Sequence, residues 1–467
     1  MALASRGRRT GKPTPKAKGR AGIPGVMRVL VVGGGGREHA IAEALLESGA
    51  ELYAVARNRN PGIARRAKAY LQASETDVEK VVQFAAGARV DFAVIGPEAP
   101  LAAGLTDALE AKEVPAVGPT REAAKLETSK EFTRRLLHDH DIPGSIEHWA
   151  FDDLEAFEHF LRDCDFEIVI KPVGLTGGKG VKVQGDHFTN AEEALECGRE
   201  ILQGKVGGVA RFLVERKAIG EEFSLQAFVD GKHVLPMPLA RDHKRALEGD
   251  RGPNTGGMGS VTMPDHRLPW VTPWDYEEAI GILEKTVEAM RARGTPFRGI
   301  LYGGFMTTKD GPKLLEYNVR FADPEGMNVL ALLEDNLAEI CGRLLDGNLP
   351  ASVRFRREAT VCKYVVPPGY GSNPKAGGRI AVDEKGVAAA GSRLYFAAVD
   401  EREDGLYQTA SRALAVVGVH EKIAAAEMFA EDALKFVRGE FAVRHDIGTE
   451  KLLAHYSARM QKLRGAA

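Results

Sequence analysis

The chain has 467 residues, of which 44% are hydrophobic and 27% are charged, and its net charge is −2. This composition predicts a globular protein of two to four domains. The apolar runs are far too short to span a bilayer and no signal peptide is visible, so we expect a cytoplasmic protein without a membrane partner.

The cysteines lie far apart, without a CxxC pair or a ligand-like histidine spacing. They are Cys164, Cys197, Cys341 and Cys362. This spacing favours a reducing compartment and argues against a zinc site or a disulfide framework. The "HDH" at 138–140 is more typical of a solvated helix end than of a metal site.

Residues 1–26 form a basic tail with seven Lys and Arg and no acid. Its Gly- and Pro-rich composition predicts disorder. The tail is either a weak polyanion tether or an upstream extension of a protein that starts at Met27. The remaining residues carry a net charge of −9, because the whole chain has a net charge of −2 and the tail contributes +7. An acidic body with 7% aromatics is a poor nucleic-acid platform, so any such contact is expected only through the tail.

Strand and helix patterns alternate from residue 29 to about residue 118. The expected strands are "RVLVV", "ELYAVA", "VDFAVIG" and "VPAVG", and the expected helices are "REHAIAEALLES", "ETDVEKVVQFAAGA" and "LTDALEAK". This order predicts an open parallel α/β sheet whose binding loops lie at the C-terminal ends of the strands.

The glycine loop "GGGGREH" follows the first strand. A dinucleotide fingerprint needs a third glycine and an acid at the end of the second strand. Glu38 or His39 stands at the third-glycine position, and the second strand ends in the basic "RNRN". A glycine loop at a helix N-terminus still offers N–H groups to one phosphate. The sequence therefore favours a sugar-phosphate site, and the alternative is a tight turn with structural glycines.

From about residue 121 helices precede strands, which is typical of an α+β arrangement. The expected helices are "EAAKLETSKEFTRRLLHDH", "LEAFEHFLRDC" and 275–293, and the expected strands are "FEIVIKPV", "KGVKVQG", "ARFLVER", "EFSLQAFVDG", "RGILYGGFMTT" and "PKLLEYNV". One helical pattern covers 327–346. The remainder from about 350 predicts strands and a final helix, with few candidate chemical residues.

A second glycine loop, "IVIKPVGLTGGKGVKV", occupies 168–183. It is not a Walker A loop, because Gly174 is one position too close to the Gly-Lys pair and Gly180 replaces the hydroxyl residue. A strand, a glycine turn and another strand can fold over a polyphosphate, with Lys171 and Lys179 supplying charge. The alternative is an ordinary exposed hairpin.

Three polar residues, Glu316, Asn318 and Arg320, recur at period two in "KLLEYNVRF". This spacing on a strand predicts that all three project from one face. Carboxylate and amide oxygens suit a Mg²⁺ ion that bridges phosphates, and an arginine can grip a carboxylate or phosphoryl oxyanion. The alternative is a solvated polar face. The polar, Gly-rich segment 241–260 predicts a loop that is either functional or disordered.

Taken in order, these segments resemble the ATP-grasp superfamily and, within it, the glycinamide ribonucleotide synthetase (phosphoribosylamine–glycine ligase) family. The matching stretches are "VGGGGREHA", "VIGPEAPLAAGL", "GPT" with "LETSKEF", "IVIKPVGLTGGKGV", "HVLPMPLARDHKR", "GPNTGGMGS", "ILYGGFM" and "LEYNVRFADPE". They cover about 27–326, and "GPNTGGMG" after "DHKR" is the most specific. The C-terminal part fits the family more loosely.

The resemblance implies a multidomain α/β and α+β fold. The implied parts are an N-terminal substrate-binding α/β domain at 27–126, an ATP-grasp domain at 127–335 with a lid at about 129–195, and a mixed C-terminal domain at 350–467. It also implies that ATP phosphorylates the glycine carboxylate and that the amine of 5-phosphoribosylamine attacks this acyl phosphate. A monomer is expected.

The resemblance also implies the residues that bind ATP and the metal. The glycine loop and two lysines would hold the phosphates, Glu215 and the backbone after it the adenine, and Glu222 the ribose. The ATP residues are Lys130, Lys171, Gly177, Gly178, Lys179, Gly180, Glu215, Lys217, Ala218 and Glu222. Glu316 and Asn318 match the ligands of Mg²⁺ or Mn²⁺.

For the other two substrates, the resemblance implies an acid for the ammonium of glycine and an arginine for its carboxylate. The glycine residues are Asp242, Arg320 and Asp323, and the catalytic residues are Arg320, Asp242 and Lys244. The ribosylamine residues are Gly34, Gly35, Gly36, Arg37, Asn60, Gly62 and Glu98.

The chain departs from the family pattern at "RNRNPG", at the lid sequence "PVGLTGGKG" and at "ADPEG" after the metal strand. These departures leave two alternatives open. One is another ATP-grasp ligase that uses a different amino acid or phosphosugar amine. The other is a non-catalytic nucleotide-binding protein on the same fold.

Overall fold

The computed structural model describes residues 26–174, 180–204, 206 and 209–465. Within these ranges, no helix combines the length and the apolar character that crossing a membrane requires.

The N-terminal elements form a wholly parallel sheet, as the sequence predicts, in the order β3-β2-β1-β4-β5. Its strands are β1 (Arg28–Val32), β2 (Glu51–Ala56), β3 (Ala69–Gln72), β4 (Phe92–Ile95) and β5 (Ala116–Val117), and its helices are α1 (Gly36–Glu47), α2 (Pro61–Ala64), α3 (Val78–Ala88), α4 (Glu98–Ala102) and α5 (Leu105–Glu110). The strand β3 was not among the four strands expected there. The order reverses between β1 and β4. The loops after these two strands therefore meet at the switch point, where such sheets bind ligands.

A short helical link leads from this sheet into a small four-stranded sheet in the order β6-β9-β7-β8. The elements are α6 (Lys125–Thr128), α7 (Lys130–Asp139), β6 (His148–Phe151), α8 (Leu154–Asp163), β7 (Ile168–Pro172), β8 (Lys182–Val183), α9 (Ala191–Leu202) and β9 (Phe212–Arg216). The small sheet has its own core around Phe157 and Phe212. This lid extends beyond the predicted 129–195, because β9 lies between β6 and β7.

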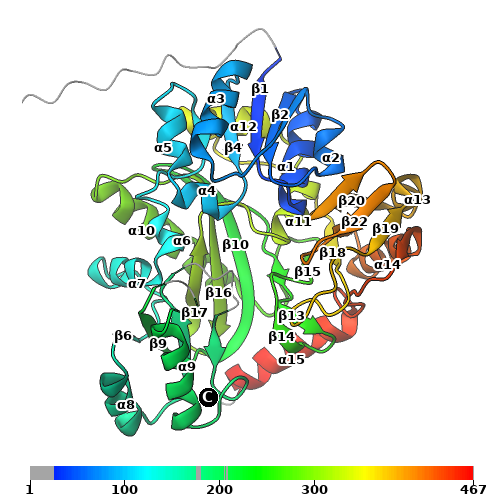
Figure 1. The fold of residues 1–467 in the computed structure, drawn as a ribbon. Coiled ribbons are helices and arrows are strands. Elements are labelled where there is room, and N and C mark those ends of the chain that lie inside the picture. The colour runs from blue at the N-terminus through cyan, green and yellow to red at the C-terminus, as the bar shows by residue number, and fades with distance from the viewer. Residues whose placement is uncertain (1–25, 175–179, 205, 207–208, 466–467) are drawn as a thin grey trace, which may run out of the picture.

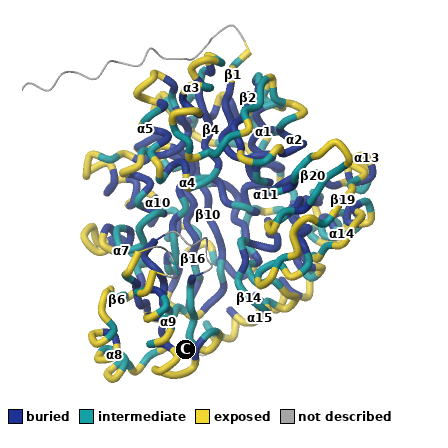
Figure 2. Tube along the Cα trace, viewed as in Figure 1, coloured by how far each residue is buried: buried dark blue, intermediate teal, exposed yellow. Residues whose placement is uncertain are grey.

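The central sheet has the order β11-β10-β16-β17. Its strands are β10 (Gly220–Asp230), β11 (Val234–Pro236), β16 (Arg298–Thr308) and β17 (Gly311–Asn318), and α10 (Pro273–Ala292) packs against it. The lid lies below and to one side of these strands in Figure 1, and the C-terminal elements lie on the other side. Figure 2 shows that β10 and β16 run through the buried interior.

A second five-stranded sheet, β12-β15-β18-β23-β20, joins the middle of the chain to its C-terminal part. Its strands are β12 (Arg241–Asp242), β15 (Gly259–Thr262), β18 (Ala359–Val365), β20 (Ser392–Phe396) and β23 (Leu414–His420). The remaining elements are β13 (Arg245–Leu247), β14 (Arg251–Asn254), α11 (Glu325–Leu332), α12 (Leu337–Leu345), β19 (Arg379–Val382), α13 (Glu384–Ala389), β21 (Val399–Arg402), β22 (Gly405–Gln408), α14 (Ile423–Ala433), η1 (Leu434–Phe436), β24 (Val437–Gly439) and α15 (Glu450–Gly465). This sheet crosses the predicted boundary between the ATP-grasp and C-terminal domains.

Two expectations about local structure are corrected. Residues 327–346 form two helices instead of one. The first helix ends because Leu333 adopts an extended backbone conformation. Asn336 then caps the N-terminus of the second helix, where its side chain accepts a hydrogen bond from the Glu339 N–H at 2.9 Å. Segment 241–260 is not an open loop. It folds into β12, the β13–β14 hairpin and the start of β15, which pairs with β18.

A fully buried lysine anchors α14 to β18. The Lys363 ammonium lies 2.7 Å from Glu427 and 2.6 Å from Glu431, one helical turn apart, and donates to the His445 carbonyl at 2.8 Å. We predict that the double change Glu427→Gln and Glu431→Gln lowers the free energy of unfolding by about 3–5 kcal/mol, because it leaves a buried cation without a counter-charge.

Urea unfolding measures this loss. Asp432→Asn is the matched control, since it removes only the surface pair with Lys435 and should leave the denaturation midpoint unchanged. Equal midpoints for the control and the double variant would contradict the anchoring role of Lys363.

Candidate active site

Charged side chains from the central sheet and from segment 241–244 converge on one site. Lys244 Nζ lies 3.0 Å from Glu222 Oε2 on β10 and 4.0 Å from Glu316 Oε1 on β17. Burial alone would lower the pKa of Lys244, but the two carboxylates outweigh burial and raise it. The predicted ribose acid, metal ligand and catalytic lysine therefore share one location.

A β-bulge precedes the two predicted metal ligands. The pairing of β16 with β17 shifts between Gly304, which faces Glu316, and Phe305, which faces Leu314, so that Leu315 is the extra residue. Such bulges re-aim the side chains that follow them. Beyond the bulge, Glu316 and Asn318 lie on one face of β17, as predicted. Arg320 lies past the end of the strand, so strand alternation does not orient it.

Arg134 of α7, which is not among the predicted site residues, holds this bulge. Its guanidinium donates to the carbonyls of Leu314 and Leu315 at 2.9 and 3.0 Å, and to Glu215 Oε1 at 2.7 Å. The other Glu215 oxygen lies 2.7 Å from Lys171 Nζ. Burial would raise the pKa of Glu215, but Arg134 and Lys171 hold it at about 2.

The expectation that the Glu215 side chain reads adenine is corrected, because both of its oxygens are held by these buried cations. The neighbouring residues 216–219 are more exposed than Glu215. Lys217 donates to the Gln184 carbonyl at 2.8 Å and lies 3.2 Å from Glu167, so its side chain holds the lid rather than the nucleotide.

The other predicted phosphate residues lie on the lid or at its base. Lys130 Nζ donates to the Gly174 carbonyl at 3.2 Å, and burial lowers the pKa of Lys130. Gly180 packs closely against Pro172 and Val206, leaving no space for a Cβ. The predicted residues Gly177, Gly178 and Lys179 lie outside the described residues.

Asp242 faces the site from β12. Its Oδ1 atom is buried and has no hydrogen-bond partner among the described residues. Burial raises the pKa of Asp242, and the nearby Glu325 carboxylate raises it further. An unpartnered buried carboxylate oxygen is costly unless a cation or a donor satisfies it. This atom is therefore suited to an ammonium group.

Arg320 is held by two acids from the N-terminal half of the chain. Its guanidinium donates to Glu127 Oε1 at 3.0 Å and lies 3.5 Å from Glu98 Oε2. Glu127 also accepts from the Val319 N–H at 2.8 Å. Burial raises the pKa of Glu127 to about 7, although Arg320 opposes that rise. Glu127 was not predicted, but it lies in the "LETSK" stretch that carries the resemblance.

The opening glycine loop is filled by its own chain. Glu38, at the position of the missing third glycine, accepts from the Gly35 N–H at 2.7 Å and from Arg37 Nε at 2.6 Å. Arg37 also donates to the Phe321 carbonyl at 3.1 Å. A Cβ on Gly36 would lie 2.5 Å from the Tyr364 hydroxyl. The Gly35 N–H is therefore not free for a phosphate, which corrects that part of the predicted cradle.

Asn60 and Gly62 are also corrected as phosphate-binding residues. Asn60 is fully buried, and its side chain accepts from the Gly62 and Ile63 N–H groups and donates to the carbonyls of Gly34 and Phe396. A Cβ on Gly62 would lie 1.9 Å from the His39 ring. Both residues therefore pack the loop against β20.

Asp323 is corrected as a glycine-binding residue. The Tyr364 hydroxyl donates to its Oδ1 at 2.5 Å, and Arg412 lies 3.1 Å from its Oδ2. Arg412 also donates to the Asp323 carbonyl at 3.1 Å and stacks on Tyr364. Both partners come from the C-terminal part, where the sequence offered no signal for them. Asp323 therefore anchors the C-terminal elements behind the site.

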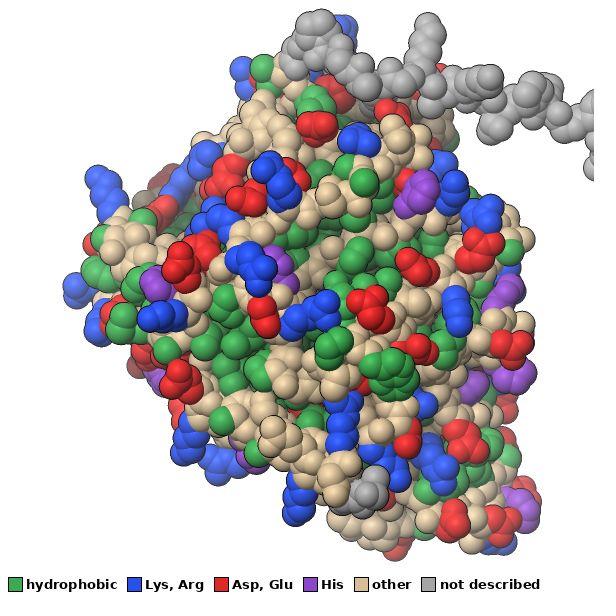
Figure 3. All heavy atoms as spheres, turned by 180° about the vertical axis from the view of Figure 1, so that it is seen from behind, with side chains coloured by type: hydrophobic (Ala, Val, Ile, Leu, Met, Phe, Trp, Pro, Cys, Tyr) green, Lys and Arg blue, Asp and Glu red, His purple; other side chains and the backbone are tan. Residues whose placement is uncertain are grey.

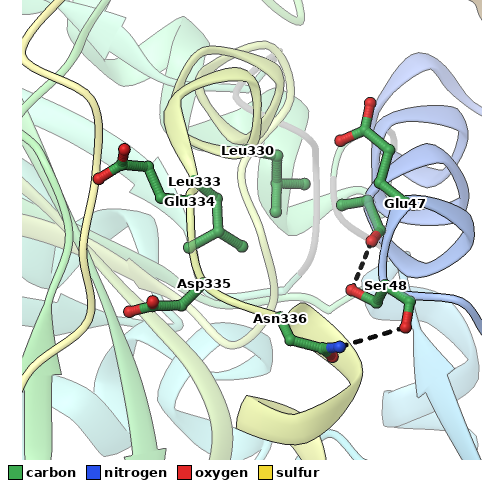
Figure 4. Close-up of a pocket in the computed structure, with 8 residues that line it drawn as sticks. Glu47, Ser48, Leu330, Leu333, Glu334, Asp335 and Asn336 are labelled. Atoms are coloured by element: carbon green, nitrogen blue, oxygen red, sulfur yellow. Dashed lines mark hydrogen bonds between the residues drawn. The ribbon is translucent and has the colours of Figure 1, made fainter.

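Two surface pockets lie away from this site. The pocket in Figure 4 has a volume of about 160 Å³ and is lined by residues of α1 and of the α11–α12 turn, where Asn336 donates to the Ser48 carbonyl at 3.1 Å. The second, of about 240 Å³, lies between α1 and β20. Figure 3 shows acidic and basic side chains interspersed over the face behind that of Figure 1.

The low pKa of Glu215 predicts a pH dependence of stability. Because the folded value of about 2 lies below the ordinary value of 4.5, this carboxylate stabilises the fold above about pH 4.5, and the stabilisation is lost as the pH falls towards 2. The shift corresponds to on the order of 3 kcal/mol. We predict that Glu215→Gln lowers the free energy of unfolding at pH 7 and that the difference from wild type narrows between pH 5 and 3.

Thermal unfolding followed across this pH range measures the difference. Glu284→Gln, at an exposed position of α10, is the control and should parallel wild type throughout. A Glu215→Gln deficit that stays constant from pH 7 to 3 would disprove the linkage.

Comparisons with known proteins give a consistent picture. The phosphoribosylamine–glycine ligase of Methanothermobacter thermautotrophicus is 50% identical over 438 residues, which is 94% of this chain and all of that protein. The ligase of Pyrococcus furiosus is 51% identical over 442 residues, covering 94% and 98%. The crystal structure of phosphoribosylamine–glycine ligase from Thermotoga maritima superposes with a TM-score of 0.77 at 28% identity, covering 90% of this chain and 100% of that one.

A more distant structural neighbour shows the fold alone. The biotin carboxylase domain of the Hydrogenobacter thermophilus 2-oxoglutarate carboxylase has a TM-score of 0.70 at 15% identity, covering 94% and 95%.

Domain models of phosphoribosylglycinamide synthetase match most of the chain. The N domain matches residues 27–127, the ATP-grasp (A) domain 128–326 and the C domain 360–450. Together with the relatives at about half identity over nearly the whole chain, these matches show that the chain belongs to the phosphoribosylglycinamide synthetase (phosphoribosylamine–glycine ligase) family.

Proposed function

We propose that the chain joins glycine to 5-phosphoribosylamine at the expense of ATP, giving glycinamide ribonucleotide, ADP and phosphate. The observation that carries this proposal is the buried Asp242 oxygen, which has no hydrogen-bond partner among the described residues and lies near Lys244 and Glu222. Lys244 in turn contacts Glu222 and Glu316. Full-length ligases that are about 50% identical support it.

A carboxylate and an amine do not condense in water, so the glycine carboxylate must first be activated as an acyl phosphate and kept from hydrolysis. The glycine oxygen attacks the γ-phosphorus of ATP and ADP leaves. The ribosylamine nitrogen then attacks the acyl carbon, phosphate leaves with the former carboxylate oxygen, and the nitrogen loses a proton. Catalysis here consists of positioning and of stabilising charge.

ATP would lie between the lid and the central sheet. Lys130 and Lys171 would neutralise its phosphates, together with the glycine loop of the lid. The exposed backbone after Glu215 would contact the adenine, and Glu222 would accept from the ribose hydroxyls. Lys244, which contacts both Glu222 and Glu316, would stabilise charge on the transferring phosphoryl group.

Glu316 and Asn318 would hold a divalent cation, either Mg²⁺ or Mn²⁺. Two hard oxygen donors on one strand face fit an ion that takes its other ligands from water and phosphate oxygens. When bound, the cation neutralises phosphate charge. The Glu316 carboxylate also lies near Lys244, so the divalent cation and the Lys244 ammonium would share it.

Glycine would bind with its ammonium on Asp242 and its carboxylate on Arg320. Glu127 and Glu98 hold Arg320 at the junction with the N-terminal sheet. We infer that 5-phosphoribosylamine binds at that sheet's switch point, near Glu98 and the loop Gly34–Arg37, and that its phosphate does not use the Gly35 N–H, which Glu38 occupies. This arrangement would bring its amine to the glycine carbon from the opposite side to ATP. We expect the protein to act as a monomer.

The direct test is ADP release from ATP, with glycine and with 5-phosphoribosylamine generated in the assay. We expect ADP release to need both, and alanine or serine to replace glycine poorly. Turnover that ignores glycine but depends on another amino acid would contradict the assigned substrate.

We predict that Glu316→Ala lowers kcat at least about a hundredfold and that added Mg²⁺ restores it only in part, because one of the two residues that would hold the divalent cation is lost. Steady-state kinetics across Mg²⁺ concentrations measure this effect. Glu284→Ala, exposed on α10, should match wild type. Normal Mg²⁺ dependence in Glu316→Ala would show that this carboxylate is not a metal ligand.

A further inference from the structure

The C-terminal helix α15 packs against the back of the strand segment 241–244, whose front carries two of the proposed catalytic residues. Resting on the proposed function, we propose that Tyr456 of α15 is a positioning residue that holds Asp242 and Lys244 in their reactive arrangement. The family-model matches end at residue 450, where this helix begins. In Figure 1, α15 crosses beside β13 and β14 at the lower end of the molecule.

Segment 241–244 alternates between two environments. Arg241 and His243 are buried, at 8% and 1% exposure, whereas Asp242 and Lys244 are more accessible. This period of two is that of an extended strand, whose successive side chains point to opposite faces. The residues that meet the substrates are therefore held in place through the two that point away from them.

Tyr456 contacts both rear-facing residues. The guanidinium of Arg241 lies 3.7 Å from the centre of the Tyr456 ring, close enough for a cation–π interaction. The Tyr456 hydroxyl lies 3.3 Å from His243 Nδ1 and donates to Asp250 Oδ2 at 2.5 Å. One side chain thus fixes both alternate positions of the segment.

Asp250 extends the contact to the hairpin that follows. Arg444 donates to Asp250 Oδ1 at 2.9 Å, and the Arg245 carbonyl accepts from the same guanidinium at 3.0 Å. Burial would raise the pKa of Asp250, but His243 and Arg241 lower it, so the carboxylate remains an acceptor for Tyr456. The turn after Lys244 is therefore fixed from the same side as the segment before it.

Arg241 transmits the position of α15 to the predicted ribose acid. It donates to Glu221 Oε2 at 2.9 Å and to the backbone carbonyl of Glu222 at 3.0 Å. Arg459, one turn after Tyr456 on the same helix, lies 3.1 Å from the other Glu221 oxygen. The helix α15 thereby supports β10 at Glu222 and also segment 241–244. These are the two parts of the chain that the contact between Lys244 and Glu222 joins.

The test compares Tyr456→Ala and Tyr456→Phe with Met460→Ala, a buried control one turn further along α15. We expect Tyr456→Ala to raise the KM for glycine about tenfold and the KM for ATP less, since small misplacements of positioned groups are costly. The KM for 5-phosphoribosylamine should stay within about twofold. Tyr456→Phe keeps the ring over Arg241 and should recover most of the loss.

Met460→Ala loosens the packing of the same helix but keeps the Tyr456 ring over Arg241. It therefore shows how far the glycine KM rises when α15 is destabilised without the loss of that ring. Equal rises in the glycine KM for Met460→Ala and Tyr456→Ala would overturn the proposal. If Tyr456→Ala does not fold, Tyr456→Leu, which fills more of the same space but also lacks the ring over Arg241, takes its place. A glycine KM for Tyr456→Leu equal to that of Tyr456→Phe would then overturn the proposal. A wild-type protein that does not use glycine instead contradicts the proposed function, so the two failures are distinct.

Discussion

The buried contact between Arg134, Glu215 and Lys171 is the constraint on which the site depends. It joins the α7 link, the last strand of the lid and the bulge of β17 through a single carboxylate. Bringing these charges out of water is costly, and mutual pairing together with the Leu314 and Leu315 carbonyls offsets that cost. The same contact fixes where Lys171 and Glu316 lie relative to each other, so the nucleotide site and the fold share their supports.

The other walls of the site follow the same pattern, in which a charged residue beside the site is held by residues from a distant part of the chain. Glu127 and Glu98 hold Arg320 from the N-terminal half. Tyr364 and Arg412 hold Asp323 from the C-terminal part. Each sheet thus supplies supports to a site that none of them builds alone. This arrangement agrees with a reaction in which three substrates must meet and water must be excluded.

Much of the architecture could be predicted from sequence, because the buried parallel strands and the amphipathic helices are local patterns. The family, the parallel N-terminal sheet and the placement of Glu316 with Asn318 on one face follow from such patterns. The supports could not be predicted, since Arg134 meets Leu315 and Arg412 meets Asp323 only after distant segments pack. For the same reason Asn60, Asp323 and Glu215, which look like ligand contacts in sequence, are structural in the fold.

The glycine loop after β1 shows most clearly what the sequence alone could not predict. Its glycines suggested a phosphate cradle, whereas Glu38 caps the helix and Tyr364 closes over Gly36.

The proposed reaction requires that the glycine carboxylate becomes an acyl phosphate in the site around Asp242 and Lys244. Turnover of glycine labelled with ¹⁸O in both carboxylate oxygens tests it most directly. We expect one label in the released phosphate and one in the amide product, and unlabelled phosphate would show that no acyl phosphate forms.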